Sequence, residues 1–371
     1  MRQNLRTPGP TPVPEESAQA ATKPMINHRG PEAKELLFRL TDRLKQLFQT
    51  QNDLFILTAS GTGALEAAIV NTLSPGDRVL AVTTGVFGDR FTSIAQAYGA
   101  QVSKQRVPWG SAADPEAVRQ ALKEDPSIKA VLITHNETST GVTNDLEVVA
   151  GVVKGEFDKL LLVDAVSAVG SIPLATDAWQ CDVVTGCSQK GWMTPPGLAM
   201  ASVSPRAWEA YREATMPRFY FDLGVAKRYL QEGQTPWTPA LSVLYSLDAS
   251  LERLLQEGVE QTFQRHAEVG QLTREGVKAL GLELFPEDER YASNTVTAIK
   301  APPGVDVGKL LELLRTEHSV VLAAGQSRLK GQIFRIGHLG LVSREDILNV
   351  LRALELTLPK VGFTPAGTIA R

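Results

Sequence analysis

Short runs of almost wholly apolar residues recur through the first half of the sequence, separated by stretches with helical periodicity. These runs span residues 55–57, 78–82, 130–133, 160–163 and 183–186. A strand that is apolar on both faces belongs in a sheet that is covered on both sides, and alternation with helices makes such a sheet parallel. Ligands of these sheets bind beyond the carboxyl ends of the strands. The sequence therefore predicts an α/β fold with a large, doubly wound, mainly parallel sheet and a crevice at one edge.

The pattern changes after residue 257, and 371 residues exceed what one hydrophobic core usually serves. Short strands near residues 295–299, 320–322 and 333–336 alternate there with a helix over 307–315 and a last helix that Ser343 opens with a capping-box pattern. We predict an N-terminal arm (1–15), a large domain (16–257) and a smaller C-terminal α+β domain (258–371).

Local signals predict several further boundaries. Proline at position 31 opens a helix with leucines at three- and four-residue spacing, and Asp114 caps another. Residues 84–88 are predicted as a turn after a strand, and one long helical stretch is predicted from Leu241 toward Leu280. The proline-rich residues 7–14 cannot be helical. They form either an extended arm that lies across a neighbouring surface or a frayed terminus.

Composition excludes several functional classes. A net charge of −3 with interspersed acids and bases gives no electrostatic footprint for nucleic acid or an anionic membrane. No apolar run is long enough to cross a bilayer, and the N-terminal residues lack the apolar core of a signal peptide. Cys181 and Cys187 cannot build a disulfide framework, and such sparse cysteine suits a reducing compartment. We therefore expect a cytoplasmic protein without a metal centre.

Lys190 stands in a loop rich in glycine and proline directly after the run 183–186. A lysine at that place is poorly solvated, and desolvation lowers the pKa of its amine so that it becomes a nucleophile near neutral pH. The alternative is an ordinary surface lysine after a strand. Asp164 favours the first interpretation, because an apolar strand ends in this one charge; its own alternative is a turn former or helix cap.

Ser60, Gly61, Thr62 and Gly63 lie between a short strand and a clear helix. Free backbone amides and the positive end of the helix dipole make this an anion site, for which phosphate is the usual ligand. An ordinary N-terminal cap is the alternative. A dinucleotide fingerprint fits poorly, because Glu66 replaces its third glycine, and no Gly-Lys-Ser/Thr follows that would make a Walker loop.

Five segments in order make the chain similar to a known family. They are residues 60–67, 134–141, 163–167, 188–190 and 334–337. Together they resemble the class V aminotransferases that use pyridoxal 5′-phosphate (PLP), in the alanine–glyoxylate/serine–pyruvate (serine–glyoxylate) branch. The resemblance covers nearly the whole chain and implies the fold-type I architecture. It also implies a homodimer with active sites at the subunit interface, and we expect the N-terminal arm at that interface.

The resemblance implies two catalytic residues. Lys190 resembles the lysine that holds PLP as an internal Schiff base and moves the proton between substrate Cα and cofactor C4′. Asp164 resembles the aspartate paired with the pyridine nitrogen, where a carboxylate keeps the ring protonated. Arg335 matches the arginine that grips the substrate α-carboxylate, since a guanidinium binds carboxylate through a planar fork.

The resemblance also implies which residues contact the cofactor. Phe87 matches an aromatic residue that stacks on the pyridine ring, with plain core packing as the alternative; relatives often carry tryptophan there. Thr235 and Thr238 match a segment that reaches the phosphate bound by the partner subunit, although some relatives have tyrosine where Thr235 stands. The phosphate and the 3′-oxygen side of the ring are contacted by Ser60, Gly61, Thr62, Gln189 and Thr138.

The implied reaction is ping-pong transfer of the amino group of a small L-amino acid, alanine or serine, to a small 2-oxo acid, glyoxylate or pyruvate. His28 and Arg29 are the nearest candidates for a second carboxylate partner. An aminoethylphosphonate transaminase is one alternative, and a non-catalytic subunit of a soluble hydrogenase is another. Two cysteines six residues apart cannot ligate the metal centres of a hydrogenase. A cysteine desulfurase is excluded, because both cysteines precede Lys190.

Overall fold

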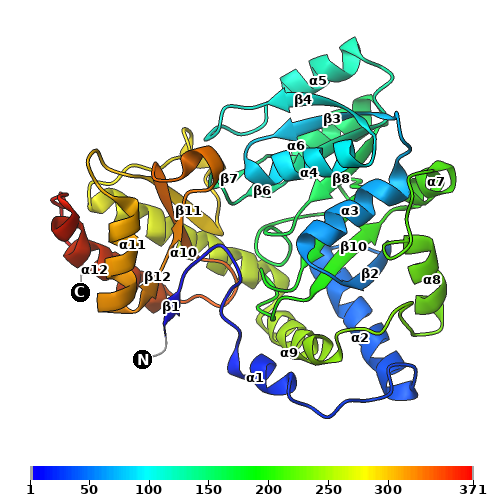
Figure 1. Ribbon diagram of the computed structural model, residues 1–371, viewed down its shortest axis with the longest axis horizontal. Coiled ribbons are helices and arrows are strands. Elements are labelled where there is room, and N and C mark those ends of the chain that lie inside the picture. The colour runs from blue at the N-terminus through cyan, green and yellow to red at the C-terminus, as the bar shows by residue number, and fades with distance from the viewer. Residues whose placement is uncertain (1–2, 370–371) are drawn as a thin grey trace.

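The computed structural model describes residues 3–369, whose centre is a seven-stranded sheet with helices on both faces (Figure 1). The strand order is β2-β10-β9-β8-β5-β3-β4. Only β10 runs against its neighbours in this sheet, and the other pairs are parallel. The predicted mainly parallel, doubly wound sheet is confirmed. Its strands are β2 (Asp53–Thr58), β3 (Arg78–Thr83), β4 (Gln101–Arg106), β5 (Ala130–Thr134), β8 (Leu160–Asp164), β9 (Val183–Cys187) and β10 (Leu198–Val203).

Alternate residues of each central strand point into two separate cores. In β3, Leu80 and Val82 enter one core, whereas Val79 and Ala81 enter the other. This follows from the two-residue period of a strand. The helices that cover the first face are α1 (Glu15–Ala20), α2 (Pro31–Phe48), α5 (Pro115–Glu124), α6 (Leu146–Ala150) with a π-helical turn (Gly151–Glu156), and α9 (Leu241–Glu257). Those that cover the second face are α3 (Gly61–Thr72), α4 (Val86–Ala97), α7 (Pro205–Glu213) and α8 (Leu223–Gln231).

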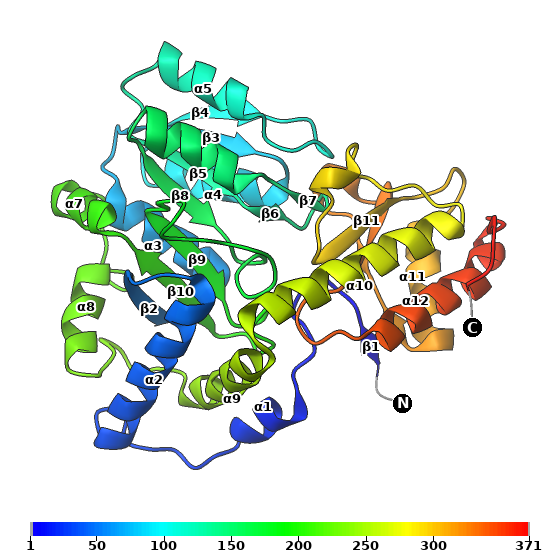
Figure 2. The same ribbon diagram turned by 180° about the vertical axis from the view of Figure 1, so that it is seen from behind.

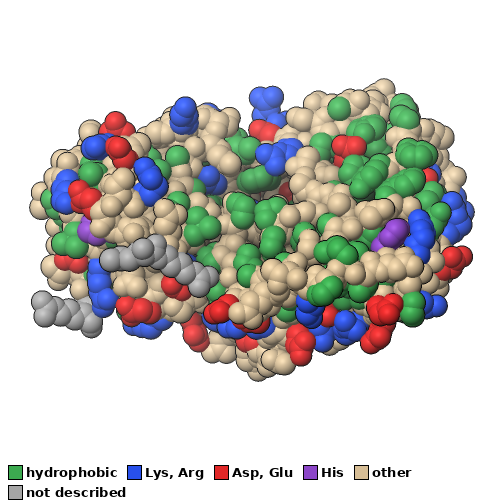
Figure 3. Space-filling model, turned by 60° about the horizontal axis from the view of Figure 1, so that its bottom comes forward, with side chains coloured by type: hydrophobic (Ala, Val, Ile, Leu, Met, Phe, Trp, Pro, Cys, Tyr) green, Lys and Arg blue, Asp and Glu red, His purple; other side chains and the backbone are tan. Residues whose placement is uncertain are grey.

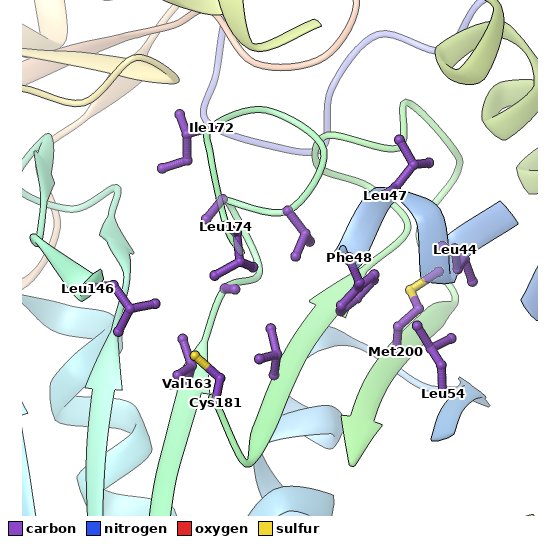
Figure 4. Close-up of a cluster of buried hydrophobic side chains, with 14 of the residues drawn as sticks. Leu44, Leu47, Phe48, Leu54, Leu146, Val163, Ile172, Leu174, Cys181 and Met200 are labelled. Carbon is purple, nitrogen blue, oxygen red and sulfur yellow. The ribbon is translucent and has the colours of Figure 1, made fainter. Parts of the chain in front are cut away.

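The first core is closed by α2, whose leucines and phenylalanine point onto the sheet. Figure 4 shows Leu44, Leu47 and Phe48 of α2 beside Met200 of β10, with Val163 of β8 further along the same face. All of these side chains are at most 1% exposed. The predicted helix that begins at Pro31 is confirmed, and Asp114 caps α5 as predicted, its carboxylate accepting from the amide of Glu116 at 2.9 Å.

A second, smaller sheet lies in the C-terminal part of the chain (Figure 2). Its strands β11 (Val296–Lys300), β14 (Ile333–Gly337) and β13 (Ala323–Ala324) are antiparallel. They pack with helices α10 (Val259–Ala279), α11 (Val307–His318) and α12 (Arg344–Thr357) around a third core. The predicted capping box of α12 is confirmed, since Ser343 and Asp346 bond each other's backbone amides. Short elements complete the list: a hairpin of β6 (Asn136–Glu137) and β7 (Val142–Thr143), and 3₁₀ turns at Glu289–Tyr291, Ser327–Leu329 and Leu358–Val361.

The predicted helical stretch from Leu241 toward Leu280 is wrong in its continuity. Two helices, α9 and α10, meet at Gly258, whose φ of 95° lies in the region that favours glycine. Apolar periodicity continues across the break, so the pattern alone does not reveal it. The break separates a helix of the first core from a helix of the third. The proposed boundary at residue 257 coincides with it and stays a prediction.

The N-terminal arm is extended and lies on its own chain. Its strand β1 (Asn4–Leu5) pairs in parallel with β12 (Val320–Val321), and the segment then runs beside the large sheet to α1 (Figure 1). Of the two alternatives for residues 7–14, an arm across a neighbouring surface is therefore the one observed.

Charged side chains of both signs are interspersed over the face seen in Figure 3. Among residues 3–369, no helix is long and apolar enough to cross a membrane.

Candidate active site

The loops that follow the central strands bring most of the predicted site residues to one edge of the sheet. Asp164 ends β8, Lys190 follows β9, and Thr138 follows β5 after the short β6. Ser60 lies between β2 and α3, and Phe87 lies in the first turn of α4 after β3. Because these strands are parallel to one another, their carboxyl ends share one edge.

Lys190 is half-buried, and its amine donates a hydrogen bond to the backbone oxygen of Pro8 at 2.6 Å. Desolvation lowers the pKa of Lys190, and the guanidinium groups of Arg335 and Arg90 lower it further. The Asp164 carboxylate acts in the opposite direction. These opposing effects show that one lysine, one aspartate and two arginines lie within electrostatic reach of each other.

Asp164 is 4% exposed. One carboxylate oxygen accepts from the amide of Val166 at 3.0 Å, and the other accepts from the hydroxyl of Thr134 at 3.4 Å. Burial raises the pKa of Asp164, while the Val166 amide and the charge of Lys190 oppose that rise. A buried carboxylate with a spare acceptor site suits pairing with a protonated ring nitrogen.

The N-terminus of α3 is open toward this edge. Ser60 is the exposed N-cap residue, with no cap bond from its own side chain. Gly61 lies against Val166, so that a Cβ atom there would be 2.9 Å from the valine Cγ2. Thr62 accepts a hydrogen bond at 3.4 Å from the guanidinium of Arg90. The positive end of the helix dipole and a nearby arginine together suit a phosphate.

Phe87 presents its ring beside this anion site. The guanidinium carbon of Arg90 lies 4.9 Å from the centroid of the Phe87 ring, within the range of a cation–π contact. Phe87 is half-buried rather than part of either core. Phe87 is thus not a residue of either core, and its stacking on the cofactor stays a prediction.

Glu137 is a fully buried carboxylate that caps α4 from a distance in sequence. It accepts from the amides of Phe87 and Gly88, each at 3.0 Å, and from the amide of Ser139 at 3.1 Å. The hydroxyl of Ser139 in turn accepts from the amide of Val86 at 2.9 Å. These bonds satisfy the free amides at the start of the helix. Burial raises the pKa of Glu137 to about 7.

The predicted turn over residues 84–88 is wrong in part for this reason. Helix α4 begins at Val86, because the cap that stabilises its first turn comes from residues 137 and 139 on another loop. Nothing near residue 86 in the sequence signals such a cap.

Arg335 projects from β14 of the smaller sheet and is 4% exposed. Its guanidinium donates to the backbone oxygen of Ala324 at 2.7 and 3.1 Å and to that of Thr138 at 2.9 Å. Among residues 3–369, no ion pair of Arg335 with a carboxylate is found. Burial lowers the pKa of Arg335 to about 10. A buried cation that is bonded only to neutral carbonyl oxygens is a strong receptor for a carboxylate.

The arrangement of Lys190, Asp164 and Arg335 agrees with the family that a comparison of the whole sequence identifies. The sequence model of the class V aminotransferases (Aminotransferase class-V) matches residues 14–342. This chain belongs to the class V aminotransferase family. Membership confirms the predicted family, the predicted enzyme class and, with it, the cofactor PLP.

Three relatives illustrate what this aminotransferase is similar to. It is 46% identical to a Synechococcus protein named soluble hydrogenase, small subunit, over 99% of this chain and 96% of that one. It is 38% identical to the serine–glyoxylate aminotransferase of Methylorubrum extorquens, over 100% of this chain and 94% of that one. The crystal structure of an alanine–glyoxylate aminotransferase from Nostoc sp. superposes with a TM-score of 0.92 and 31% identity, covering 96% of each chain. The fold-type I architecture is thereby confirmed.

Gln189 and Thr138 reach the site of this aminotransferase through their backbones. The Gln189 carbonyl accepts from the amide of Thr11 at 3.1 Å, and the Thr138 carbonyl accepts from Arg335. Gln189 is half-buried and Thr138 is 2% exposed. Both lie beside the charged residues, and their contacts with the cofactor remain predictions.

Thr235 and Thr238 are not brought to Lys190 within one chain. The hydroxyl of Thr235 donates to the backbone oxygen of Trp237 at 2.7 Å, and Thr238 is exposed. Arg29 lies near the same segment, with its guanidinium 2.5 Å from the side-chain oxygen of Gln234. Thr235 is half-buried and Thr238 is exposed, and the amide of Ala240 in the same segment donates to the hydroxyl of Thr58 at 3.2 Å, two residues before Ser60. Contacts of Thr235 and Thr238 with the cofactor stay a prediction.

The two cysteines of this aminotransferase are buried and chemically quiet. Burial raises the pKa of Cys181 and of Cys187 to about 12. A thiol with so high a pKa is neither a nucleophile nor a ready metal ligand. Among residues 3–369, no group of three or more His, Cys, Asp or Glu side chains could hold a metal ion.

Proposed function

We propose that this aminotransferase transfers the amino group of alanine or serine to glyoxylate, and less readily to pyruvate, in two half-reactions that share one site. The observation that carries the proposal is Arg335. It is a buried guanidinium without a carboxylate partner in residues 3–369, close enough to Lys190 to lower the pKa of the lysine. Amino acids and 2-oxo acids share the α-carboxylate that such a group binds.

The side chains of this site fit PLP. Lys190 would hold it covalently, Asp164 would pair with the ring nitrogen, and the open N-terminus of α3 at Ser60, Gly61 and Thr62 would hold the phosphate. Gln189, Thr138 and Phe87 would complete the contacts with the cofactor. When bound, PLP supplies an electron-accepting ring that stabilises negative charge on the substrate Cα.

Lys190 acts on the proton at the substrate Cα. Desolvation favours the neutral amine, which has a lone pair that accepts a proton. Asp164 remains close enough to interact with the lysine charge and is buried, so water does not screen it. Arg335 fixes the carboxylate of the substrate. With the amino group and the carboxylate both bound, the side chain on Cα is the group that sets substrate specificity.

The small-substrate preference rests on the lack of a second buried cation near Arg335 in residues 3–369. The basic groups that perturb the pKa of Lys190 are Arg335 and Arg90, and Arg90 is exposed and already contacts Thr62. His28 and Arg29 lie beside the segment of Thr235 instead. A buried site without a distal partner discriminates against a second carboxylate.

We further propose a cytoplasmic homodimer in which Thr235 and Thr238 reach the phosphate site of the partner subunit. Support comes from an aromatic cluster beside these threonines. Phe219 and Tyr220 stack on Trp237 at centroid distances of 5.0 and 5.9 Å, although Phe219 is 77% and Tyr220 is 42% exposed. Exposed stacked aromatic side chains are typical of surfaces that a partner covers. The place of the N-terminal arm at this interface stays a prediction.

The hydrogenase name of one relative suggests a different role, that of a structural subunit. The convergence of Lys190, Asp164 and Arg335 favours the aminotransferase, because a structural subunit has no use for a desolvated lysine beside a buried arginine. Metal analysis of the pure protein checks this: we expect no nickel and no iron, and a stoichiometric nickel–iron content would contradict us.

A panel of amino donors against glyoxylate, pyruvate and 2-oxoglutarate tests the substrate assignment. We expect alanine and serine as donors and glyoxylate as the best acceptor. If 2-oxoglutarate is the best acceptor, or aspartate the best donor, the small-substrate proposal is wrong. Arg335→Lys should lose activity in every pairing, because lysine offers a single point of charge where arginine offers a fork.

A further inference from the structure

The N-terminal arm is fastened to the smaller sheet at its outer end. The amide of Arg6 donates to the oxygen of Val321 at 2.8 Å, and the amide of Gly337 donates to the oxygen of Arg6 at 2.7 Å. The guanidinium of Arg6 is buried, where it donates to the oxygen of Leu341 at 2.9 Å and lies 3.2 Å from the Asp346 carboxylate. The arm is therefore hydrogen-bonded to the end of β14, the strand that carries Arg335.

The inner end of the arm is fastened to the loop that carries the lysine. The amide of Thr11 donates to the oxygen of Gln189 at 3.1 Å, and its hydroxyl donates to the oxygen of Lys190 at 3.0 Å. Thr11 is 4% exposed, so these bonds are shielded from water. Between the two fastened ends, the backbone oxygen of Pro8 accepts the hydrogen bond from the Lys190 amine at 2.6 Å.

The fit of the arm against the lysine leaves no space for a side chain. Gly9 has a φ of 131°, which favours glycine, and a Cβ atom there would lie 2.7 Å from both Cδ and Nζ of Lys190. A Cβ atom on Gly337 would likewise collide with the backbone of Thr7. The arm thus packs tightly against the Lys190 side chain on one side and against the end of β14 on the other.

We propose that the Pro8 carbonyl oxygen positions the Lys190 amine whenever that amine is not bonded to the cofactor. The inference rests on the proposed function of Lys190. A neutral amine has two hydrogens and one lone pair, so donating one hydrogen to Pro8 fixes its direction and leaves the lone pair free. The lone pair of Lys190 would accept the proton as the Cα–H bond breaks, and bound PLP would supply the electron-accepting group for the bonding electrons left on the carbon. The arm is therefore a positioning element of the active site in its own subunit.

A structure of the protein loaded with pyridoxamine phosphate, in which the amine of Lys190 is free, tests the contact directly. We expect Nζ of Lys190 within about 3.2 Å of the Pro8 oxygen, the ordinary range for such a bond. An amine bonded elsewhere, with Pro8 more than about 4 Å away, a distance beyond hydrogen bonding, would overturn the inference. Failure to bind pyridoxamine phosphate would overturn the proposed function itself, a distinguishable result.

Gly9→Ala tests the consequence for rate. The added methyl group collides with Lys190, and misplacement of a reacting group by about 1 Å costs about 10²-fold in rate. We expect kcat to fall about 10²-fold while KM changes less than about threefold, because Arg335 still binds the carboxylate. The visible circular dichroism of the bound cofactor should change as well. Gly304→Ala is the matched control, since Gly304 also has a positive φ (82°) but nothing within 4 Å of the added methyl group.

Thr11→Val provides a second variant in case Gly9→Ala folds poorly. It removes the hydroxyl bonds to the Lys190 oxygen at 3.0 Å and to the Gln189 oxygen at 3.5 Å, and it should lower kcat about tenfold, less than a direct collision with the amine. Its control is Thr22→Val, whose hydroxyl bonds the Gln19 oxygen in an exposed turn far from the site. Variants of Gly9 and Thr11 that match their controls in kcat and in circular dichroism would contradict a positioning role for the arm.

Discussion

At the scale of single residues, the site combines one amine, two carboxyl groups and two guanidinium groups in a small volume. The pKa shifts of Lys190, Asp164 and Arg335 all have burial as their largest cause, which lowers the first and third and raises the second. Each shift disfavours the charged form. A bound ligand of opposite charge would favour the charged form of each group again. Perturbed pKa values of this kind cluster at functional sites.

Asp164→Asn tests the role of that buried carboxylate. Asparagine keeps the size of the side chain and a hydrogen bond, but it loses the charge that keeps a ring nitrogen protonated. We expect the variant to bind PLP and to lose at least ~10²-fold in kcat, the scale for removing one electrostatic stabiliser. Asp145→Asn, which changes an exposed helix cap, is the control. A fully active Asp164→Asn enzyme would show that Asp164 is structural.

Lys190 and Asp164 could be singled out from the sequence because each ends or directly follows an apolar strand, where one charged residue is conspicuous. Arg335 could be proposed only through the resemblance to the family. Arg90 and Glu137 were missed. Arg90 is an exposed residue one turn into α4, and only the folded chain shows its guanidinium over Phe87. Glu137 looks like an ordinary loop acid until its contacts with the amides of α4 are seen.

At the scale of elements, the loop from Asn136 to Gly141 links the two sides of the site. The Glu137 carboxylate holds the start of α4, which carries Phe87, while the adjacent Thr138 carbonyl accepts from Arg335. The Asn136 side chain donates to Ser167 and Thr295 at 2.8 Å, tying the loop to both sheets. One short loop thus sets the distance between the proposed ring platform and the carboxylate receptor.

Glu137→Ala tests this role of the loop. Three amides and a hydroxyl lose their buried acceptor, and unsatisfied buried donors cost about 1–3 kcal/mol each. We expect the free energy of unfolding to fall by about 3 kcal/mol or more, measured by urea denaturation. Glu283→Ala is the control, because the Glu283 side chain is largely exposed and pairs with the exposed Lys300, so its loss should cost about 0–1 kcal/mol. If the free energy of unfolding falls equally in the two variants, Glu137 does not stabilise the fold through these hydrogen bonds.

Elements that the local sequence does not mark escaped prediction. Strand β4 alternates partly exposed polar residues at the sheet edge, so it lacks the apolar run that marks its neighbours. Strand β10 follows the Pro-Pro-Gly segment and runs antiparallel between β2 and β9, a pairing that only tertiary packing decides. Likewise, the break at Gly258 follows from which core each helix joins.

At the scale of the whole molecule, three buried histidines couple stability to pH. Burial lowers the pKa of His135 and of His266 to about 4 and that of His338 to about 3. The unfolded value is about 6.5, so the stability from each neutral ring is present above pH 6.5 and is lost as the pH falls toward 4. Glu137 acts oppositely between about pH 7 and pH 4.5, because its folded pKa is raised to about 7. Asp164, whose pKa burial also raises, acts in the same direction as Glu137, and the three histidines outnumber these two carboxyl groups.

His135→Phe isolates one histidine. His135 packs edge-on against Trp179 and its Nδ1 has no hydrogen-bond partner within residues 3–369, so phenylalanine preserves the packing. We expect the free energy of unfolding of the natural chain to fall between pH 6.5 and pH 4. The variant should fall less steeply by up to about 1.4 kcal/mol per pH unit, the share of one proton. Parallel curves for the two proteins would contradict the assignment.

The architecture as a whole was the most predictable level, because apolar strands alternating with helices leave few arrangements. The partner of the surface at Thr238, Phe219 and Tyr220 is a question of assembly rather than of the single chain, and these three residues are exposed. If the proposed dimer is required for cofactor binding, sedimentation should find dimers at full PLP occupancy, and a fully active monomer would contradict it.

The central claim is that Lys190 carries the cofactor. We predict that the purified protein is yellow and that borohydride abolishes its visible absorption band by fixing the cofactor to the chain. Peptide mapping should then find the cofactor on Lys190, while Lys190→Ala should keep the fold, take up no fixed cofactor and have no turnover. A cofactor fixed instead to Lys154, which is paired with Asp182 at 2.7 Å, or to Lys159 or Lys227, would contradict the claim.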